Sequence, residues 1–358
     1  MLFTSKLSIC KRTHQQSVNP DLPQERRETV RLPKFDYRSP KNVQEASTIL
    51  LDQPAAKVLA GGTDLLVNMK HRVETPSTIV NLKGLPNLDY VRKENGTLRI
   101  GTLTPLKRVY KDPFVAQNLP ALAVAAASVG SYHHQTMGTI GGNLCQQTRC
   151  KYFNQSKWWR SSRPLCFKAG GEICHVAKKE RVCYSTYCGD TAPALLVLDA
   201  QVVLTGKQDS RQVPLADIYS GEGKTPLQLE PGEILTEVVI PAQAGEGFST
   251  YTKFANRGSI DFPIVGAALW TSKSSRESRI ALTAVDRKPV RALQLEEFMK
   301  GKELGQEIID AVDGLVTKES RLMMSSTDSL SHKRQLMGLL VKDAIRQAMG
   351  GKRSETGY

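Results

Sequence analysis

The apolar positions near the start of the chain follow first a helical and then a strand pattern. Val43, Ala46, Ile49 and Leu50 recur at the three- and four-residue spacing of one helix face. A short apolar run, KVLA, follows and leads directly into a pair of glycines. This region therefore predicts a helix, a strand and a glycine turn, in that order.

The middle of the chain predicts further strands, a buried helix and a second glycine turn. β-branched runs bounded by Pro, Asn and Gly predict strands at STIVNL and LRIGTL, and an alanine-rich run predicts a buried helix at PALAVAAASVG, ending at Gly130. The second turn is GTIGGN. Later segments predict an apolar helix or strand followed by a strand in PALLVLDAQVVLTG, and an alternating strand in EILTEVVIPA.

The last third of the chain predicts a separate α+β domain over residues 246–350. Pro241 to Gly247 resembles a linker, and the strand-like segments YTKFANR, IVGAALWT and RIALTAV come after it. Two long helical patterns complete this part. Residues 1–30 are interpreted as an N-terminal extension without a secretory signal, and residues 351–358 as a frayed tail.

Size and composition are those of a globular protein. The chain has 358 residues, of which 40% are hydrophobic and 23% are charged. No apolar run approaches the roughly 18 residues that a membrane span requires. We therefore expect a cytoplasmic protein without a membrane span.

Positive charge and cysteines are concentrated in the same segment. The formal net charge is +14, and half of that excess lies between Cys145 and Cys188, where nine Lys or Arg face two Glu. Six of the seven cysteines lie in the same 44 residues. Without an export signal, clustered cysteines favour metal binding over disulfides.

The two glycine turns are candidate anion sites. In Ala60–Asp64 and Gly138–Asn143, backbone N–H groups can converge on a pyrophosphate because glycine allows close approach. Each turn alone is more typical of an ordinary connecting loop. The chain has no G-x-G-x-x-G motif, and GEGKT at 221–225 lacks the first glycine of a phosphate-binding loop, so it is interpreted as a surface loop.

Five motifs in order carry a resemblance to a known family. AGGTDLL, MGTIGGNL, GDTAPALLVLDA, EILTEVVIP and YTKFANRGSIDFPIVGAAL resemble segments of the FAD-binding subunits of xanthine dehydrogenase, carbon monoxide dehydrogenase and other molybdenum hydroxylases. The resemblance implies an α+β chain with a PCMH-type FAD-binding fold over 31–245, in subdomains of about 31–85 and 86–245. A small α+β domain with an antiparallel sheet follows over 246–350.

The resemblance also implies which residues bind FAD. Asp190 would bind the ribityl hydroxyls, Leu235 would pack near the flavin, and Lys253 would lie close to its ring. Without the motifs, Asp190 also fits a helix N-cap and Lys253 a solvated strand position. The residues implied to hold the pyrophosphate and ribityl chain are Ala60, Gly61, Gly62, Thr63, Asp64, Leu65, Thr139, Gly141, Gly142 and Asn143.

The cysteine segment is an insert at about residues 146–188, and it resembles that of the beta subunits of 4-hydroxybenzoyl-CoA reductases. This resemblance implies a 4Fe-4S cluster bound by Cys150, Cys166, Cys174 and Cys183. Cys145 is expected to be a buried structural thiol, and Cys188 a bystander. Zinc is the alternative metal, although only Cys145–Cys150 and Cys183–Cys188 approach the close spacing of zinc knuckles. His175 is expected at the surface or beside the ligands.

The implied function is electron transfer within a heteromeric enzyme, with no catalytic residue on this chain. A large partner would hold the molybdopterin cofactor and a small partner two 2Fe-2S clusters, in a dimer of heterotrimers. The implied activity is reductive dehydroxylation of an aromatic acyl-CoA, with electrons from ferredoxin. The alternative is an oxidative xanthine, aldehyde or aromatic hydroxylase. A zinc-binding nucleic-acid module is a distant alternative that leaves the glycine turns unused.

Overall fold

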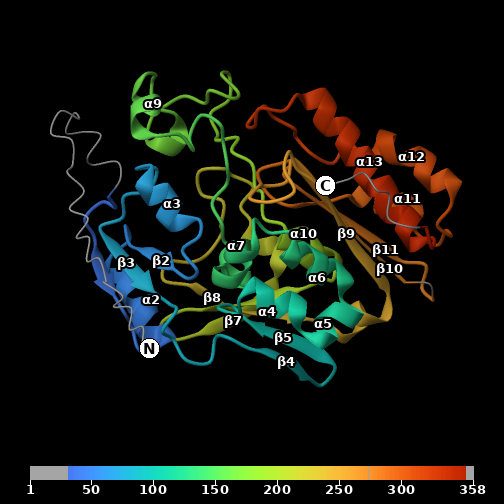
Figure 1. Ribbon diagram of the computed structural model, residues 1–358, viewed down its shortest axis with the longest axis horizontal. Coiled ribbons are helices and arrows are strands. Elements are labelled where there is room, and N and C mark those ends of the chain that lie inside the picture. Colours follow the sequence, from blue (N-terminus) through green and yellow to red (C-terminus); the bar gives the residue numbers. More distant parts are fainter. Residues whose placement is uncertain (1–30, 273, 352–358) are drawn as a thin grey trace, which may run out of the picture.

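The computed structural model describes residues 31–272 and 274–351, which form three sheets with flanking helices (Figure 1). The α+β class predicted from the sequence is confirmed. The N-terminal extension predicted over 1–30 and all but the first residue of the predicted tail lie outside the described residues.

The first sheet is parallel and carries the first glycine turn. Its strands, in the order β1-β3-β2, are β1 (Asp36–Arg38), β3 (Thr78–Asn81) and β2 (Lys57–Leu59). The predicted helix is α2 (Val43–Asp52), which lies between β1 and β2 in the chain. It begins after Asn42, whose side chain accepts a hydrogen bond from the Glu45 N–H at 2.8 Å. After β2 the chain passes through the turn into α3 (Leu65–Lys70).

The second sheet is antiparallel, with strand order β4-β5-β8-β6-β7. Its strands are β4 (Val91–Glu94), β5 (Thr97–Gly101), β6 (Gln201–Thr205), β7 (Ser210–Pro214) and β8 (Ile234–Ile240). β8 is a strand as predicted, but it is buried at all of its positions and not only at alternate ones. It is the central strand and both of its faces are covered, so its polar Glu237 is buried and pairs with Arg99.

Between β5 and β6 the chain forms several helices. They are α4 (Leu106–Lys111), α5 (Pro113–Asn118), α6 (Pro120–Ala127), α7 (Tyr132–Met137), α8 (Ile140–Leu144), α9 (Lys157–Ser161), the 3₁₀ helix η1 (Phe167–Ala169) and α10 (Thr191–Val197). Of these, α4, α5, α6, α8 and α10 share one core with this sheet, whereas α9 and η1 belong to the cysteine segment. The predicted alanine-rich helix is α6, which ends at Ala127 and not at Gly130. The apolar segment after the cysteines divides into α10 and β6.

The third sheet is antiparallel, with order β12-β11-β10-β9, and helices cover both of its faces (Figure 1). Its elements are β9 (Phe248–Phe254), β10 (Val265–Thr271), β11 (Ser278–Thr283), β12 (Val290–Arg291), α11 (Leu293–Met299), α12 (Gln306–Val316) and α13 (Leu330–Ala348). Alternate residues of β10 separate two cores: Leu269 packs with α12 and α13, whereas Ala268 and Trp270 join the core around α6 and α10.

The predicted linker at 241–247 contains a 3₁₀ helix, η3 (Ala242–Glu246), packed on the body of the protein. The Trp270 indole N–H donates to the Ala244 carbonyl at 3.0 Å. The last sheet is therefore fixed to the preceding part of the chain. None of the described helices is long and apolar enough to cross a membrane.

Candidate functional site

The two glycine turns line one cavity of about 500 Å³. Twelve of the thirteen residues expected to contact FAD are in its wall, and the exception is Lys253. Those twelve are Ala60, Gly61, Gly62, Thr63, Asp64, Leu65, Thr139, Gly141, Gly142, Asn143, Asp190 and Leu235. The fold thus brings together residues that are far apart in the sequence, up to the 175 positions between Ala60 and Leu235.

The first turn and the second touch backbone to backbone. A Cβ atom added to Gly61 would lie 2.2 Å from the Met137 carbonyl oxygen and 2.8 Å from the Gly138 Cα. Gly62 has a φ of +74°, in the left-handed region that favours glycine. Gly62 therefore allows the chain to turn from β2 into α3, and Gly61 allows the second glycine segment to contact this turn closely.

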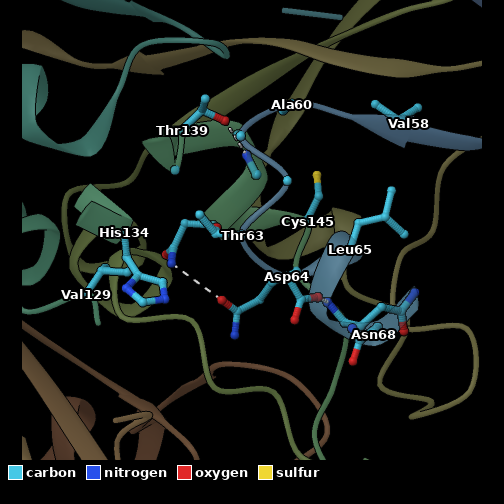
Figure 2. A pocket seen from close by; sticks show the side chains of 18 of the residues that line it. Val58, Ala60, Thr63, Asp64, Leu65, Asn68, Val129, His134, Thr139 and Cys145 are labelled. Atoms are coloured by element: carbon cyan, nitrogen blue, oxygen red, sulfur yellow. Dashed lines mark hydrogen bonds between the residues drawn. The ribbon is translucent and has the colours of Figure 1, made fainter. Parts of the chain in front are cut away.

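The second glycine segment is helical and not a simple turn. Thr139 is the N-cap of α8, and its Oγ1 accepts a hydrogen bond from the Gly142 N–H at 3.0 Å. The Asn143 Oδ1 accepts from the Thr191 N–H at 3.1 Å and from its hydroxyl at 2.6 Å, so α8 is tied to α10. Figure 2 shows Thr139 facing the same cavity as Thr63 and Asp64 of the first turn.

Asp190 is held at the back of the cavity by two residues of β9. It occupies the N-cap position of α10 but makes no side-chain capping bond. Its carboxylate instead accepts a hydrogen bond from the Tyr251 hydroxyl at 2.8 Å and lies 3.1 Å from the Lys253 ammonium. Burial raises the pKa of Asp190, while Lys253 and Tyr251 oppose that rise. The capping alternative is therefore wrong for this side chain.

Lys253 is buried behind Asp190 and not solvated. Only 12% of its side chain is exposed, and its ammonium also donates to the Ser128 carbonyl at 2.8 Å and to the Asp261 carbonyl at 3.0 Å. In this arrangement Lys253 braces the loop that contains Asp261, and Asp261 lines the cavity. Its predicted proximity to the flavin ring stays a prediction.

The sequence reasoning missed Arg149 as a cavity residue. Its guanidinium lies 3.2 Å from the Asp64 carboxylate and stacks over the Phe262 ring, 4.7 Å from the ring centre. Arg149 precedes Cys150, so a single residue links the cysteine segment to the first glycine turn. In the sequence, Arg149 was noted only as one of the nine Lys or Arg residues between Cys145 and Cys188.

The cavity fits a dinucleotide. Its polar groups are few and converge from different elements, which is typical of cofactor sites. The two glycine segments present backbone N–H groups, and a helix N-terminus favours phosphate. The buried Asp190 carboxylate is an acceptor suited to sugar hydroxyls. Ala60 and Leu65 add apolar wall next to the turns (Figure 2).

A second, smaller cavity is lined by all four of the predicted cluster ligands, Cys150, Cys166, Cys174 and Cys183. Cys166 is half-buried and the other three are buried. The two remaining described cysteines do not line it: Cys145 lines the large cavity, and the Cys188 thiol lies 3.5 Å from the Thr186 carbonyl. The fold thus separates the cysteines into the groups that the sequence predicted, and their ligand role stays a prediction.

The arrangement of the thiols bears on the choice of metal. Among the described residues, no three or more His, Cys, Asp or Glu side chains converge as a single ion requires. A structural zinc ion holds four ligands at about 2.0–2.3 Å from one centre. A 4Fe-4S cluster binds each thiolate through a different iron, so its ligands stand around a larger space. The four thiols share a cavity of only about 10 Å³, and the choice between a cluster and zinc stays a prediction.

Two of these thiols have a pKa above the ordinary value for cysteine. Burial raises the pKa of Cys150 to about 11 and also raises the pKa of Cys183. Metal binding to them would release their protons. His175 lines the cavity, but its Nε2 donates to the Pro164 carbonyl at 2.9 Å and its ring packs on Tyr152.

The GEGKT loop is more than a surface loop, because its Gly223 is buried and supports the cysteine segment. The Cys183 N–H donates to the Glu222 carboxylate at 3.0 Å. A Cβ on Gly223 would lie 2.5 Å from the Ser185 hydroxyl oxygen. On its other side the insert contacts the C-terminal part of the chain, where Arg321 lies 2.6 Å from the Glu180 carboxylate.

Comparison with known proteins identifies two family models along the chain. Residues 33–243 match the FAD binding domain in molybdopterin dehydrogenase, and residues 249–348 match the CO dehydrogenase flavoprotein C-terminal domain. The first match alone covers more than half of the chain.

Individual relatives agree with these models. The chain is 29% identical over 334 residues to the FAD subunit of nicotinate dehydrogenase from Eubacterium barkeri, covering 88% of this chain and 98% of the relative. It is 32% identical over 272 residues to the FAD-binding subunit of aldehyde oxidoreductase from Escherichia coli, covering 72% and 83%. Among solved structures, it is similar to carbon monoxide dehydrogenase from Hydrogenophaga pseudoflava, with a TM-score of 0.72, 26% identity, and coverage of 89% and 99%.

Proposed function

The chain belongs to the family of FAD-binding subunits of molybdenum hydroxylases, and from this we propose that it transfers electrons within a heteromeric enzyme whose substrate site is on another chain. Its relatives are FAD subunits of oxidoreductases. The observation that carries the proposal is the convergence of both glycine segments and Asp190 on one cavity. FAD supplies the redox chemistry there, and the protein supplies position and electrostatics.

We assign the residues of the cavity as follows. The N–H groups of Gly61, Gly62 and the start of α8 face the pyrophosphate, and Asp190 accepts hydrogen bonds from the ribityl hydroxyls. Tyr251 and Lys253 hold the Asp190 carboxylate in place from β9. Leu235 provides apolar wall. The division into subdomains at 31–85 and 86–245 and a domain at 246–350 is part of the same proposal.

The proposed complex contains a large molybdenum subunit and a small 2Fe-2S subunit, as a dimer of heterotrimers. The relatives that support this are themselves described as FAD subunits or medium chains. A reducing compartment suits the free thiols of the insert, which supports a cytoplasmic location. We propose an oxidative reaction on an aldehyde or N-heterocyclic substrate, because the relatives are a nicotinate dehydrogenase, an aldehyde oxidoreductase and xanthine dehydrogenases.

Reductive dehydroxylation of an aromatic acyl-CoA, with electrons from ferredoxin, is the second candidate. The feature that favours it is the insert, with four cysteines around one cavity. In either case we propose a 4Fe-4S cluster bound by Cys150, Cys166, Cys174 and Cys183. Both directions of electron flow use the same cofactors on this chain, so the partner's substrate decides between them.

The purified complex distinguishes the two directions. Under anaerobic conditions, an oxidative enzyme bleaches its flavin absorbance when an aldehyde or N-heterocycle is added. A reductive enzyme does the opposite: flavin reduced by ferredoxin regains its absorbance when an aromatic acyl-CoA is added. A complex that contains no FAD would refute the proposed function itself.

Two variants test the assignment of cofactors to residues. Cys166→Ser should abolish the 4Fe-4S signal in electron paramagnetic resonance, while FAD stays bound and the 2Fe-2S signals of the partner remain. Gly62→Val should lower FAD content and leave iron in place, because its Cβ would meet Leu59 and Leu66 at 3.0–3.1 Å in a backbone conformation that disfavours side chains. Full iron content in Cys166→Ser would contradict the ligand set, and Cys188→Ser is the matched control.

A further inference from the structure

Lys168 is half-buried and places its ammonium group beside the four-cysteine cavity. It lines that cavity together with Cys150 and Cys183. Its Nζ donates to the Thr148 carbonyl at 3.0 Å, to the Thr148 hydroxyl, and to the Ser185 hydroxyl at 3.4 Å. Among the described residues no carboxylate forms an ion pair with it. A cation taken partly out of water without a counter-charge is costly, so a negative group next to it would stabilise the site.

The hydrogen bonds around Lys168 also constrain two hydroxyl protons. Because the ammonium donates to the Thr148 and Ser185 hydroxyl oxygens, the protons of both hydroxyls must point elsewhere. The Thr148 hydroxyl donates to the Gly223 carbonyl at 2.6 Å. The Ser185 hydroxyl donates to the same carbonyl at 2.9 Å, and its oxygen lies 3.2 Å from the Cys183 sulfur. Thr148 and Ser185 thus hold the Lys168 ammonium next to one of the four thiols.

We propose that Lys168 raises the reduction potential of the iron–sulfur cluster held by the four cysteines through its positive charge. This inference rests on the cluster of the proposed function. A cluster bound by four thiolates is anionic, and reduction adds one more negative charge. A nearby cation and hydrogen bonds to the ligand sulfurs stabilise the reduced form, which raises the potential.

The test is a redox titration of the purified complex, followed by electron paramagnetic resonance. Lys168→Met should shift the reduction equilibrium at least tenfold toward the oxidised cluster, which for one electron is about 59 mV. Lys168→Arg keeps the charge and should stay near the wild-type potential. Lys178→Met removes an exposed lysine from the same insert and is the matched control. An unchanged potential in Lys168→Met would overturn the proposal.

Iron analysis distinguishes a failure of this proposal from a failure of the proposed 4Fe-4S cluster itself. If the wild-type complex contains no iron beyond that of the partner's 2Fe-2S clusters, the cluster assignment fails. If Lys168→Met loses iron and Lys168→Arg keeps it, the charge is required by the cluster, which supports the proposal. If both variants lose iron, the space filled by the side chain matters and its charge does not, which overturns the proposal.

Discussion

Replacing Gly61 by alanine should weaken FAD binding more than any similar change outside the cavity. The new Cβ would lie 2.2 Å from the Met137 carbonyl oxygen and 2.8 Å from the Gly138 Cα. Both neighbours are backbone atoms, so the clash can be relieved only by moving the two glycine segments apart. Overpacking of this kind costs about 1–3 kcal/mol.

The cost can appear in either of two measurements. If the segments separate, the FAD-free protein is not strained, but FAD binding must bring the segments back together and so restores the strain. The Kd for FAD then rises roughly 5- to 150-fold, since about 1.4 kcal/mol corresponds to a factor of ten. If they stay in contact, the free energy of unfolding falls by about 1–3 kcal/mol instead. Titration of FAD-free protein with FAD and denaturant unfolding measure the two quantities.

Gly84→Ala is the control, because a Cβ at this exposed glycine meets no atom within 4 Å. It should change neither the Kd for FAD nor the free energy of unfolding by more than a few tenths of a kcal/mol. If Gly61→Ala behaves like Gly84→Ala in both assays, the contact between the two glycine segments does not hold in solution, and the site built on it is wrong.

Three further changes have defined outcomes. Arg149→Ala removes the partner of Asp64 and Phe262, so the Kd for FAD should rise about tenfold with iron retained; Arg163→Ala, which stacks on Trp159, should leave the Kd unchanged. Gly314→Ala, in the exposed part of α12 with no atom within 4 Å, should increase the free energy of unfolding by about 0.5–1 kcal/mol, and a decrease would contradict this. Burial lowers the pKa of Lys333 below 10.5, so the unfolded chain binds this proton more tightly than the folded chain does. The free energy of unfolding of the wild type should therefore rise as the pH increases from that lowered pKa toward 10.5. Lys333→Met should flatten this rise, and parallel profiles for the two proteins would refute the reasoning.

The features that the sequence predicted well depend on local physics. The helix α2 follows from the spacing of Val43, Ala46, Ile49 and Leu50, because one helix face packs on the neighbouring strands. The division of the cysteines was also predicted from the chain: the four assigned to the cluster line one cavity, while Cys145 and Cys188 do not. Their order and the family resemblance carried that prediction, since spacing alone does not place side chains in space.

Other predictions failed because distant segments determine the outcome. β8 was expected to alternate, but neighbours on both sides bury it throughout. The second glycine motif forms the short helix α8 instead of a turn, and this outcome is local, because Thr139 caps the helix three residues away. The GEGKT segment is a loop with Lys224 and Thr225 exposed, as predicted, but it also supports Cys183 through Glu222.

What the sequence determined by itself was the set of elements, the two glycine segments and the group of cysteines, since residue spacing and glycine's backbone freedom act within a few positions. Only the tertiary structure decided which side chains meet. It turned Asp190 away from its helix toward Tyr251, placed Arg149 against Asp64, and set Lys168 beside the cysteines without a carboxylate partner in the described part of the chain. These contacts join residues that lie 20 to 85 positions apart, and pairing at such separations depends on how the sheets and helices pack, which no local pattern encodes.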